Sequence, residues 1–319
     1  MTAAEPPAAV FLMGPTAAGK TDLALGIAER LPVRLISVDS AMIYRGLDIG
    51  TAKPSPAILE RFPHHLINLR DPIEPYSAAH FRQDALAALL EARAEGRVPL
   101  LVGGTLLYFR ALEQGLSVMP QADPEVRARL AQEAAELGWA GLHERLALLD
   151  PAAATRIHRN DPQRIQRALE VIELTGRTLT DLWETGGETP PLRVLKLIRA
   201  PEQREVLRER IQRRFQTMLD QGFEREVRGL WQQPGMHRDL PALRAVGYRQ
   251  MIGYLLGEYG QDEMTAQAIT ATQQLAKRQL TWLRPMTESL WLGDSSGPPL
   301  DRAMSAIEGF LANSGAGTT

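Results

Sequence analysis

The chain has no cysteine among its 319 residues, which excludes disulfide bonds, zinc ribbons and thiol nucleophiles. It also lacks a signal-peptide pattern at its beginning and any apolar run that approaches 18 residues. We therefore expect no transmembrane helix, no membrane partner and a cytoplasmic location. Lysine is scarce as well: 32 of the 36 basic residues are arginine, and the lysines are Lys20, Lys53, Lys196 and Lys277.

The net charge of −2, taken alone, argues against a nucleic-acid partner. The excess of arginine has two explanations, which are the base composition of the genome and guanidinium groups that bind phosphates or bases. Local clusters of basic residues must decide between them. With 44% hydrophobic residues, the chain has the composition of a globular protein with one large domain or two modest ones.

The most informative stretch has the G-x-x-x-x-G-K-T spacing of a P-loop: Gly14-Pro15-Thr16-Ala17-Ala18-Gly19-Lys20-Thr21. The apolar run 8–13 predicts a strand before it, and the pattern of 21–30 predicts a helix after it. In such a loop the backbone N–H groups and the helix N-terminus attract phosphate. Lys20 adds a full positive charge, and the hydroxyl group of Thr21 is a ligand for Mg²⁺. The flanking strand and helix disfavour a chance match, so we expect a di- or triphosphate to bind here.

Further apolar runs at 33–38, 98–102 and 193–199 predict more strands of the same sheet. Asp39 follows the first run and Gly103-Gly104-Thr105 follows the second, so both lie at the carboxyl edge of the sheet beside the P-loop. Asp39 is either a carboxylate that removes a proton or a helix N-cap. The glycines either form a tight turn or allow a ligand to approach closely. The predicted fold class is α/β, a P-loop NTPase-like parallel sheet flanked by helices.

The stretch from Ala122 to Gly186 is different, because it has helical periodicity without a convincing strand and is bounded by proline and glycine. It predicts helices at 123–137, 139–149, 162–175 and 178–185. We therefore expect an all-helical insertion domain at 122–190 and a P-loop catalytic core made of 1–121 and 191–319. The other expected elements are helices at 77–94, 201–232 (one long helix or a helix pair) and 266–283, a short strand at 66–69 and a disordered tail at 312–319.

The adjacent histidines His64 and His65 lead into the expected short strand. Neighbouring side chains on a strand point to opposite sides of it, so we expect no shared metal ion.

Three groups of basic residues remain to be explained. The first is Arg164 and Arg167 with nearby Arg156, His158 and Arg159; the second is Arg244–Arg249, and the third is Lys277–Arg284. Each group alone is typical of a solvated helix face or a C-terminal cap. Together, on a phosphate-binding scaffold, they favour a polyanionic second substrate, which we expect to be a nucleic acid.

The P-loop and a carboxylate opposite it are also the arrangement of small-molecule kinases. An ATP-dependent kinase is therefore one alternative, and it predicts ATP consumption coupled to product formation. A nucleic-acid-binding module with a vestigial P-loop is another. The chain lacks a second acidic strand end of the kind found in helicases and motor ATPases. The P-loop is a nucleotide-binding motif in any case, so ATP binding without turnover stays open.

Several longer motifs resemble the tRNA dimethylallyltransferase family, also called tRNA isopentenyltransferases. The resemblance spans about residues 8–293 in order. It rests on the P-loop together with 39–44 (Asp-Ser-Ala-Met-Ile-Tyr), 48–54 (Asp-Ile-Gly-Thr-Ala-Lys-Pro), 101–108, 160–170 (Asn-Asp-Pro-Gln-Arg-Ile-Gln-Arg-Ala-Leu-Glu), 245–250 and 275–284 (Leu-Ala-Lys-Arg-Gln-Leu-Thr-Trp-Leu-Arg).

The resemblance implies a prenyltransferase that moves a dimethylallyl group from dimethylallyl diphosphate to N6 of adenosine 37. The acceptors would be tRNAs that read codons beginning with U, and the products N6-(dimethylallyl)adenosine and diphosphate. The P-loop would hold the departing diphosphate. Lys20, Thr21 through Mg²⁺, and Arg214 would stabilise its growing charge, and Asp39 would accept the proton from the adenine amine.

The resemblance also implies the partners. They are the anticodon stem-loop of tRNA, on which the helical insertion would close, and the prenyl donor, and we expect the enzyme to be a monomer. The residues that would touch tRNA are Asp39, Ser40, Ala41, Met42, Thr105, Arg127, Gln163, Arg164, Ile165, Gln166, Arg167, Arg244, Ala245, Val246, Gly247, Tyr248, Arg249, Lys277, Arg278, Gln279, Leu280, Thr281, Trp282, Leu283 and Arg284.

Overall fold

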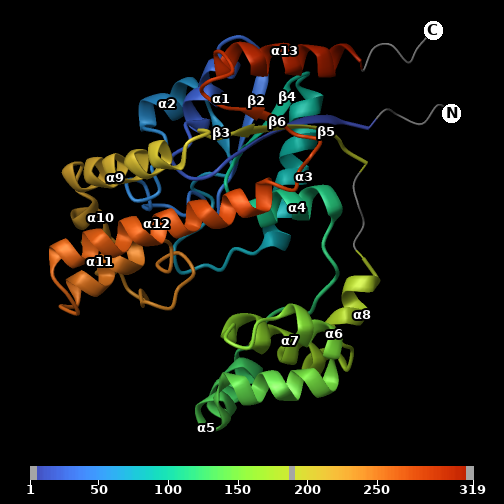
Figure 1. Ribbon diagram of the computed structural model, residues 1–319, viewed down its shortest axis with the longest axis vertical. Coiled ribbons are helices and arrows are strands. Elements are labelled where there is room, and N and C mark those ends of the chain that lie inside the picture. The colour runs from blue at the N-terminus through green and yellow to red at the C-terminus, as the bar shows by residue number, and fades with distance from the viewer. Residues whose placement is uncertain (1–5, 187–190, 314–319) are drawn as a thin grey trace. The chain divides into compact units, whose positions relative to one another are not determined.

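The computed structural model describes residues 6–186 and 191–313. The chain divides into two compact units, one made of Met1–Glu113 and Pro191–Thr319 and the other of Gln114–Pro190 (Figure 1). The helical unit thus begins at Gln114, before the boundary expected near 121. Most of the tail expected at 312–319 lies outside the described residues, and Ala312 is the last residue of a helix.

A six-stranded sheet forms the centre of the first unit, in the order β3-β2-β4-β1-β5-β6. All neighbouring strands run parallel. The strands are β1 (Ala8–Met13), β2 (Val33–Val38), β3 (His64–His65), β4 (Val98–Gly103), β5 (Arg193–Arg199) and β6 (Leu290–Leu292). The predicted α/β class is therefore confirmed, and the strand that leads into the P-loop lies inside the sheet, between β4 and β5.

Helices cover both faces of this sheet. Val10 and Leu12 of β1 are buried on one face, and Phe11 and Met13 are buried on the other. Burial on both faces explains why the sequence shows continuous apolar runs rather than alternation. The first face packs against α1 (Lys20–Ala28) and α13 (Pro299–Ala312), and the second against α3 (Ala78–Ala94) and α4 (Leu106–Gln114).

The strand expected at 66–69 is wrong. The paired residues are His64 and His65, which lie next to Leu35 and Ile36 of β2. Leu66 (φ 62°) and Asn68 (φ 57°) adopt the left-handed conformation, which turns the chain away from the sheet. Two elements at the end of the chain, β6 and α13, were not expected at all. β6 is short, so its sequence carries little periodicity.

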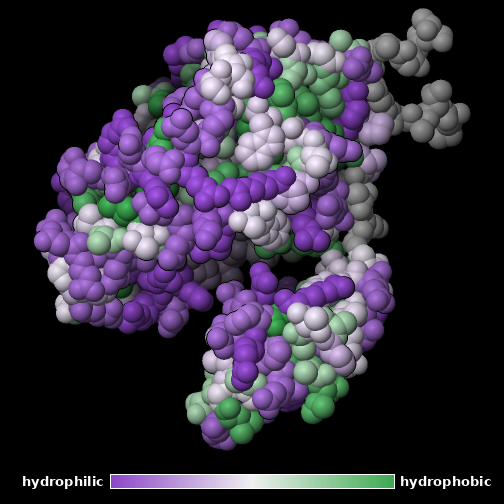
Figure 2. Space-filling view, in the orientation of Figure 1, coloured by the Kyte–Doolittle hydropathy of each residue, from purple (hydrophilic) through white to green (hydrophobic). Residues whose placement is uncertain are grey.

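The remaining helices of the first unit are α2 (Pro56–Arg61), α9 (Arg204–Asp220), α10 (Phe223–Trp231), α11 (Tyr248–Leu255) and α12 (Gln261–Leu283). The arginine-rich stretch 201–232 is a helix pair, because Gly222 between α9 and α10 has φ 94° and so ends the first helix. Figure 1 shows α12 running beside α11. Mostly hydrophilic side chains cover α11 and α12 on the face seen in Figure 2.

The second unit is entirely helical in its described part, 114–186, with its own buried apolar core. Its helices are α5 (Pro124–Leu149), α6 (Pro151–Arg156), α7 (Pro162–Thr175) and α8 (Leu179–Glu184). Gly138 (φ 74°) breaks α5 into the two helices that the sequence predicts. The aspartates Asp123, Asp150 and Asp161 each accept backbone N–H bonds at a helix start that has proline in its first turn, which is why these helices begin where they do.

Across both units, none of the helices among the described residues has the length and apolar character needed to cross a membrane.

Candidate active site

A cavity of about 1220 Å³ lies at the carboxyl edge of the sheet. The P-loop after β1, Asp39 after β2, Gly104-Thr105 after β4 and Arg199 at the end of β5 all line it. The three strand ends singled out in the sequence therefore meet in one place. Other segments that line it are Ser40–Met42, Gly50–Ala52, Arg213-Arg214, Arg244–Tyr248, Arg278-Gln279 and Trp282.

The P-loop is held close to the neighbouring strand. A Cβ atom on Gly14 would lie 2.1 Å from the carbonyl oxygen of Arg199, so only glycine fits at this position. Ala17 has φ 62° and Gly19 has φ 82°, and Ala17 is thus a non-glycine residue in the left-handed region. Such a conformation persists only where the surroundings enforce it, which is common at ligand sites.

The side-chain amine of Lys20 contacts the backbone of the P-loop. Its Nζ donates hydrogen bonds to the carbonyl oxygens of Gly14 (3.0 Å) and Pro15 (2.7 Å). Burial of the amine, assisted by the positive charge of Arg214, lowers the pKa of Lys20 from 10.5 to about 7, although Asp39 acts in the opposite direction. A bound anion would offset both effects and restore the charge of this lysine.

Asp39 holds a turn with one carboxylate oxygen and leaves the other oxygen without a hydrogen bond in the described chain. Its Oδ1 accepts backbone N–H bonds from Ala41 (2.8 Å) and Met42 (3.2 Å), although it caps a turn rather than a helix. Its Oδ2 makes no hydrogen bond within 6–186 or 191–313. The hydroxyl oxygen of Thr105 accepts the N–H of Ser40 (3.1 Å), which holds the next residue in place. One carboxylate oxygen therefore remains available to a substrate on the wall of the cavity.

Gln279 joins helix α12 to the P-loop. Its Oε1 accepts the N–H of Thr16 (2.9 Å), and its Nε2 donates to the carbonyl oxygen of Gly104 (2.8 Å). A Cβ on Gly104 would lie 2.4 Å from that Nε2. Gly104 therefore allows a close approach by the side chain of Gln279. The amide of Gln279, one of the residues expected to touch tRNA, is engaged inside the protein.

Arg214 on α9 lines the same cavity. Its Nη2 donates to the carbonyl oxygen of Thr51 (3.0 Å). Burial lowers the pKa of Arg214, and Asp39 raises it. Arg214 and Asp39 thus act electrostatically on Lys20, and Asp39 acts on Arg214. Within the described chain, neither of these cations makes an ion pair.

Two further arginines in the cavity wall, Arg199 and Arg210, were not among the predicted site residues. Arg199 donates to the carbonyl oxygen of Leu292 (2.9 Å) and pairs with Asp294, which also pairs with Arg210 (3.2 Å). The sequence does contain a signal for Arg199, because it ends strand β5 just as Asp39 follows β2. Asp294 had no such signal, since it lies beyond the unexpected strand β6.

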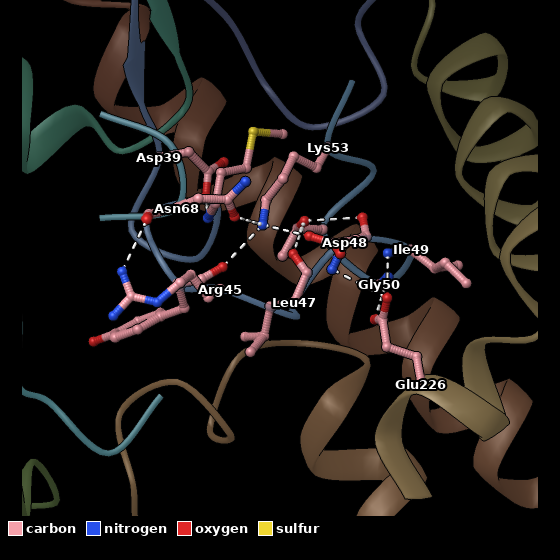
Figure 3. Close-up of polar contacts among 12 residues, drawn as sticks. Asp39, Arg45, Leu47, Asp48, Ile49, Gly50, Lys53, Asn68 and Glu226 are labelled. Atoms are coloured by element: carbon pink, nitrogen blue, oxygen red, sulfur yellow. Dashed lines mark hydrogen bonds and ion pairs between the residues drawn. The ribbon is translucent and has the colours of Figure 1, made fainter. Parts of the chain in front are cut away.

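The loop 47–53 borders the cavity and is held by hydrogen bonds to Glu226 and Lys53 (Figure 3). Glu226 of α10 accepts the backbone N–H groups of Asp48, Ile49 and Gly50. Lys53 donates to the carbonyl oxygen of Tyr44 and to two side-chain oxygens. Neither Glu226 nor Lys53 was predicted to be a site residue.

The segment 244–249 divides into exposed and buried members. Arg244 and Arg249 are exposed, and Arg244 lines the cavity with Ala245, Val246 and Gly247. Tyr248 is 0% exposed, and its hydroxyl group donates to Glu226 (2.6 Å). Burial, with Glu226 nearby, raises the pKa of Tyr248. Its side chain packs in the core, which leaves the two arginines as the groups available to an RNA.

The end of α12 shows the same division. Leu283 is buried and Leu280 packs against the cluster of Leu207, Ile211 and Ala276. Trp282 is 40% exposed and lines the cavity. The exposed polar and basic members of this segment are Lys277, Arg278, Thr281 and Arg284.

The predicted tRNA contacts of the helical unit surround a buried carboxylate. Glu170 of α7 is 0% exposed and accepts from Arg127 Nε (2.8 Å), Arg167 Nη1 (2.6 Å) and the N–H of Asp123 (2.9 Å). Burial alone would raise the pKa of Glu170, but these hydrogen bonds outweigh it and lower the pKa.

The other expected contacts on α7 differ in exposure. Ile165 is 0% exposed. Gln163 and Arg164 are exposed, and Gln166 donates to the carbonyl oxygen of Arg127 (3.0 Å). The side chain of Ile165 thus belongs to the core of the unit, and the polar members lie at its surface.

No group of three or more histidine, aspartate or glutamate side chains that could hold a metal ion occurs among the described residues. A metal ion at this site would therefore depend on a few protein ligands and on the oxygens of the bound phosphate. Thr21 at the start of α1 and Asp39 are among the cavity residues whose oxygens suit a hard cation.

The chain is similar to known proteins over most of its length. Residues 42–286 match the family model "IPP transferase". The tRNA isopentenylpyrophosphate transferase of Bacillus halodurans is 35% identical, with 96% of both chains covered and a TM-score of 0.69. The tRNA delta(2)-isopentenylpyrophosphate transferase of Staphylococcus epidermidis is 30% identical over 95% of this chain and 99% of that one, with a TM-score of 0.67.

A eukaryotic dimethylallyltransferase acting on tRNA has the same fold, with a TM-score of 0.80 at 23% identity over 96% of this chain and 80% of that one. The family match starts at residue 42, so the P-loop and Asp39 lie before it, but the two bacterial structures cover nearly the whole chain. The chain therefore belongs to the IPP transferase family and is a prenyltransferase.

Proposed function

We propose that this enzyme transfers a dimethylallyl group from dimethylallyl diphosphate to N6 of adenosine 37 of tRNA, in tRNAs that read codons beginning with U. The observation that carries the proposal is a cavity in which a phosphate-binding loop, two cations and a carboxylate meet. Neither cation has an ion-pair partner in the described chain, and only one oxygen of the carboxylate accepts hydrogen bonds there. Family membership and the tRNA-acting relatives support tRNA as the acceptor.

The donor binds with its diphosphate on the P-loop. When the allylic C–O bond breaks, positive charge develops on the prenyl carbons and negative charge grows on the diphosphate. Lys20 and Arg214 stabilise that negative charge, and they do so more strongly in the transition state than in the ground state, which is the condition for catalysis. No phosphoryl group moves, so ATP is not required.

Asp39 acts on the acceptor. The amine of adenine is a weak nucleophile because its lone pair is delocalised into the ring. The free Oδ2 of Asp39 accepts an amine proton as the N–C bond forms, while Oδ1 keeps the turn at Ala41 and Met42 in place. The turn therefore fixes the direction of the base.

Mg²⁺ fits the donor set of the cavity. A hydroxyl oxygen (Thr21), a carboxylate and phosphate oxygens are the ligands that this ion prefers, and it usually keeps several waters. We propose that Thr21 holds it together with the diphosphate. When bound, Mg²⁺ supplies positive charge to the leaving group.

The acceptor base must leave the anticodon stack to reach the cavity, at a cost of a few kcal/mol. The exposed cations Arg244, Arg249 and Arg278 lie on elements that border the cavity, and they suit the RNA backbone. Trp282, which is 40% exposed on the cavity wall, offers an aromatic surface on which a base can stack. Arg127 and Arg167 of the helical unit add two further cations for the anticodon arm.

The test is prenyl transfer to an unmodified anticodon stem-loop with radiolabelled dimethylallyl diphosphate and Mg²⁺. We expect label in the RNA and one diphosphate released per transfer without ATP. Two stem-loops with adenosine 37 and different bases at position 36, which pairs with the first codon base, test the codon class. ATP consumption coupled to product would instead support a kinase, and neither reaction would support a binding module.

A further inference from the structure

A half-buried carboxylate occupies the centre of the loop that follows Leu47. Glu226 Oε2 accepts the backbone N–H groups of Asp48 (3.1 Å) and Ile49 (2.6 Å), and its Oε1 accepts that of Gly50 (3.1 Å). The hydroxyl group of Tyr248 donates to the same Oε1 (2.6 Å). Figure 3 shows Glu226 reaching the loop from α10. Successive amides that converge in this way form an anion-binding nest, and here a side chain of the protein fills it.

The opposite side of the loop is held by Lys53. Its Nζ donates to Tyr44 O (2.8 Å), Asp48 Oδ1 (2.6 Å) and Asn68 Oδ1 (2.7 Å), and its side chain is only 3% exposed. Figure 3 places this amine at the centre of the polar contacts. A buried ammonium group with all three donors used is a rigid attachment point. The loop therefore has one conformation, fixed from both sides.

Thr51 connects the loop to the cavity. Its carbonyl oxygen accepts Nη2 of Arg214 (3.0 Å), and its hydroxyl group donates back to Leu47 O (2.7 Å). Ala52, the next residue, has φ 52°, a conformation that costs an alanine about 1 kcal/mol or more and needs support from its surroundings. The carbonyl group that holds Arg214 thus depends on the geometry of the whole loop.

We propose that Glu226 is a positioning residue for Arg214. By neutralising the amide nest it fixes the loop, the loop fixes the Thr51 carbonyl group, and that carbonyl group aims the guanidinium group at the diphosphate. The inference rests on the proposed function in so far as Arg214 faces the leaving group. Glu226 itself lies on the far side of the loop and touches no substrate.

Glu226→Gln isolates this role. A glutamine at this position has a similar shape, but its NH₂ group would face N–H donors. Whichever way the amide is turned, either the N–H groups of Asp48 and Ile49 or that of Gly50 lose their acceptor. The N–H groups of Ile49 and Gly50 are partly buried, where an unsatisfied donor is unfavourable. We expect the loop to shift and Arg214 to lose its fixed direction.

The experiment is a double-mutant cycle with Glu226→Gln, Arg214→Ala and the double variant. One readout is binding of inorganic diphosphate by calorimetry, and the other is kcat for prenyl transfer to the stem-loop. We expect Glu226→Gln to weaken both by about ten- to a hundredfold, as misplaced catalytic groups do. In the Arg214→Ala background, the same substitution should have no further effect, because its target is gone.

The matched control is Glu224→Gln on the same helix. Within residues 6–186 and 191–313, Glu224 pairs with Arg228 alone, at the surface (2.7 Å), so both readouts should stay at wild-type values. Equal losses from Glu226→Gln in the presence and absence of Arg214, or no loss at all, would overturn the proposal. If Glu226→Gln does not fold, Glu226→Asp keeps the charge but cannot reach all three amides, and it takes the same place in the cycle. The diphosphate cycle gives its answer even if the wild-type enzyme fails to prenylate the stem-loop, so the two failures are distinguishable.

Discussion

Two cations of the cavity and four arginines of the helical unit differ in their partners. In the cavity, Lys20 and Arg214 make hydrogen bonds to carbonyl groups and no ion pair within the described chain. In the helical unit, Arg127 and Arg167 share the buried Glu170. Two more arginines of that unit, Arg129 and Arg145, pair with Glu173.

The difference distinguishes cations that are available to a ligand from cations that stabilise the fold through ion pairs. Burial without an ion-pair partner in the described chain lowers the pKa of Lys20 to about 7, so this amine is less stable as a cation than an exposed lysine and favours a bound anion. Glu170 is buried with partners, and its pKa falls below the usual value, so its charge is stable. Charge without a partner in a cavity therefore indicates where an anion binds, whereas abundance of arginine does not.

The strongest test of the cavity is Asp39→Asn. The asparagine oxygen can still accept from Ala41 and Met42, but the side chain can no longer take a proton. We expect kcat to fall by about 10²–10⁴-fold, the usual contribution of a positioned base, with RNA affinity reduced far less. Single-turnover kinetics and stem-loop binding by filter assay measure the two quantities.

Asp39→Ala is the companion variant, because it also removes the cap and should cost about 0.5–2 kcal/mol of stability in addition. Equal losses of turnover and RNA affinity in Asp39→Asn would show that Asp39 only binds or caps.

Glu170→Ala tests the other side of the comparison. It leaves Arg127 and Arg167 without their counter-ion, and we expect the helical unit to lose about 2–3 kcal/mol. This is less than for a fully buried pair, because the side chains of both arginines still reach water. Hydrogen exchange of α5 and α7 measures the local loss, and donor affinity in the cavity should not change. Unaltered exchange in α5 and α7 would remove Glu170 from its structural role.

The pH dependence of diphosphate binding tests whether the charge of Lys20 depends on a bound anion. Below pH 7, Lys20 is already protonated in the empty protein; above pH 7, it must take up a proton when the anion binds and raises its pKa again. Affinity should therefore fall as pH rises above 7, by up to about tenfold per pH unit.

Calorimetry in two buffers with different ionisation enthalpies measures the proton uptake directly. We expect uptake close to one proton at pH 8 to 9 for the wild type, over and above that of Lys20→Arg, because arginine keeps its charge in this range. The same uptake in both proteins would exclude Lys20 as its source.

The smallest expected effect belongs to Arg167→Ala. Arg167 shares its charge with Glu170 and donates to the carbonyl oxygen of Pro120 (2.6 Å), so only part of its charge is available to RNA. We expect the slope of log affinity against log salt to fall by about 0.7–0.9 or less, with kcat at saturating RNA unchanged. Arg129→Ala, whose side chain pairs with Glu173 in the same unit, is the control, and an equal change there would show that the effect is not specific to Arg167.

Much of the cavity was predictable because the signals are local. The P-loop spacing, the strand before it and the carboxylate after β2 each occupy a few adjacent residues, and parallel strands bring their carboxyl ends to one edge. The strand expected at 66–69 failed for an equally local reason, since the left-handed conformations of Leu66 and Asn68 do not follow from hydrophobicity.

The contacts that the sequence did not reveal join residues far apart in the chain. Glu226 binds amides 176 to 178 residues before it, and Gln279 joins its helix to a loop 263 residues earlier. Asp294 pairs with Arg199 across a gap of 95 residues. No periodicity or short motif records such contacts.

By itself, therefore, the sequence determined the α/β class, the phosphate-binding loop and the aspartate beside it, because each of these signals lies within a few adjacent residues. Only the tertiary structure decided which cations have a partner and which are held for a ligand. Pairing is a property of three-dimensional distance and burial, and both are set by how helices separated in the chain pack around the sheet.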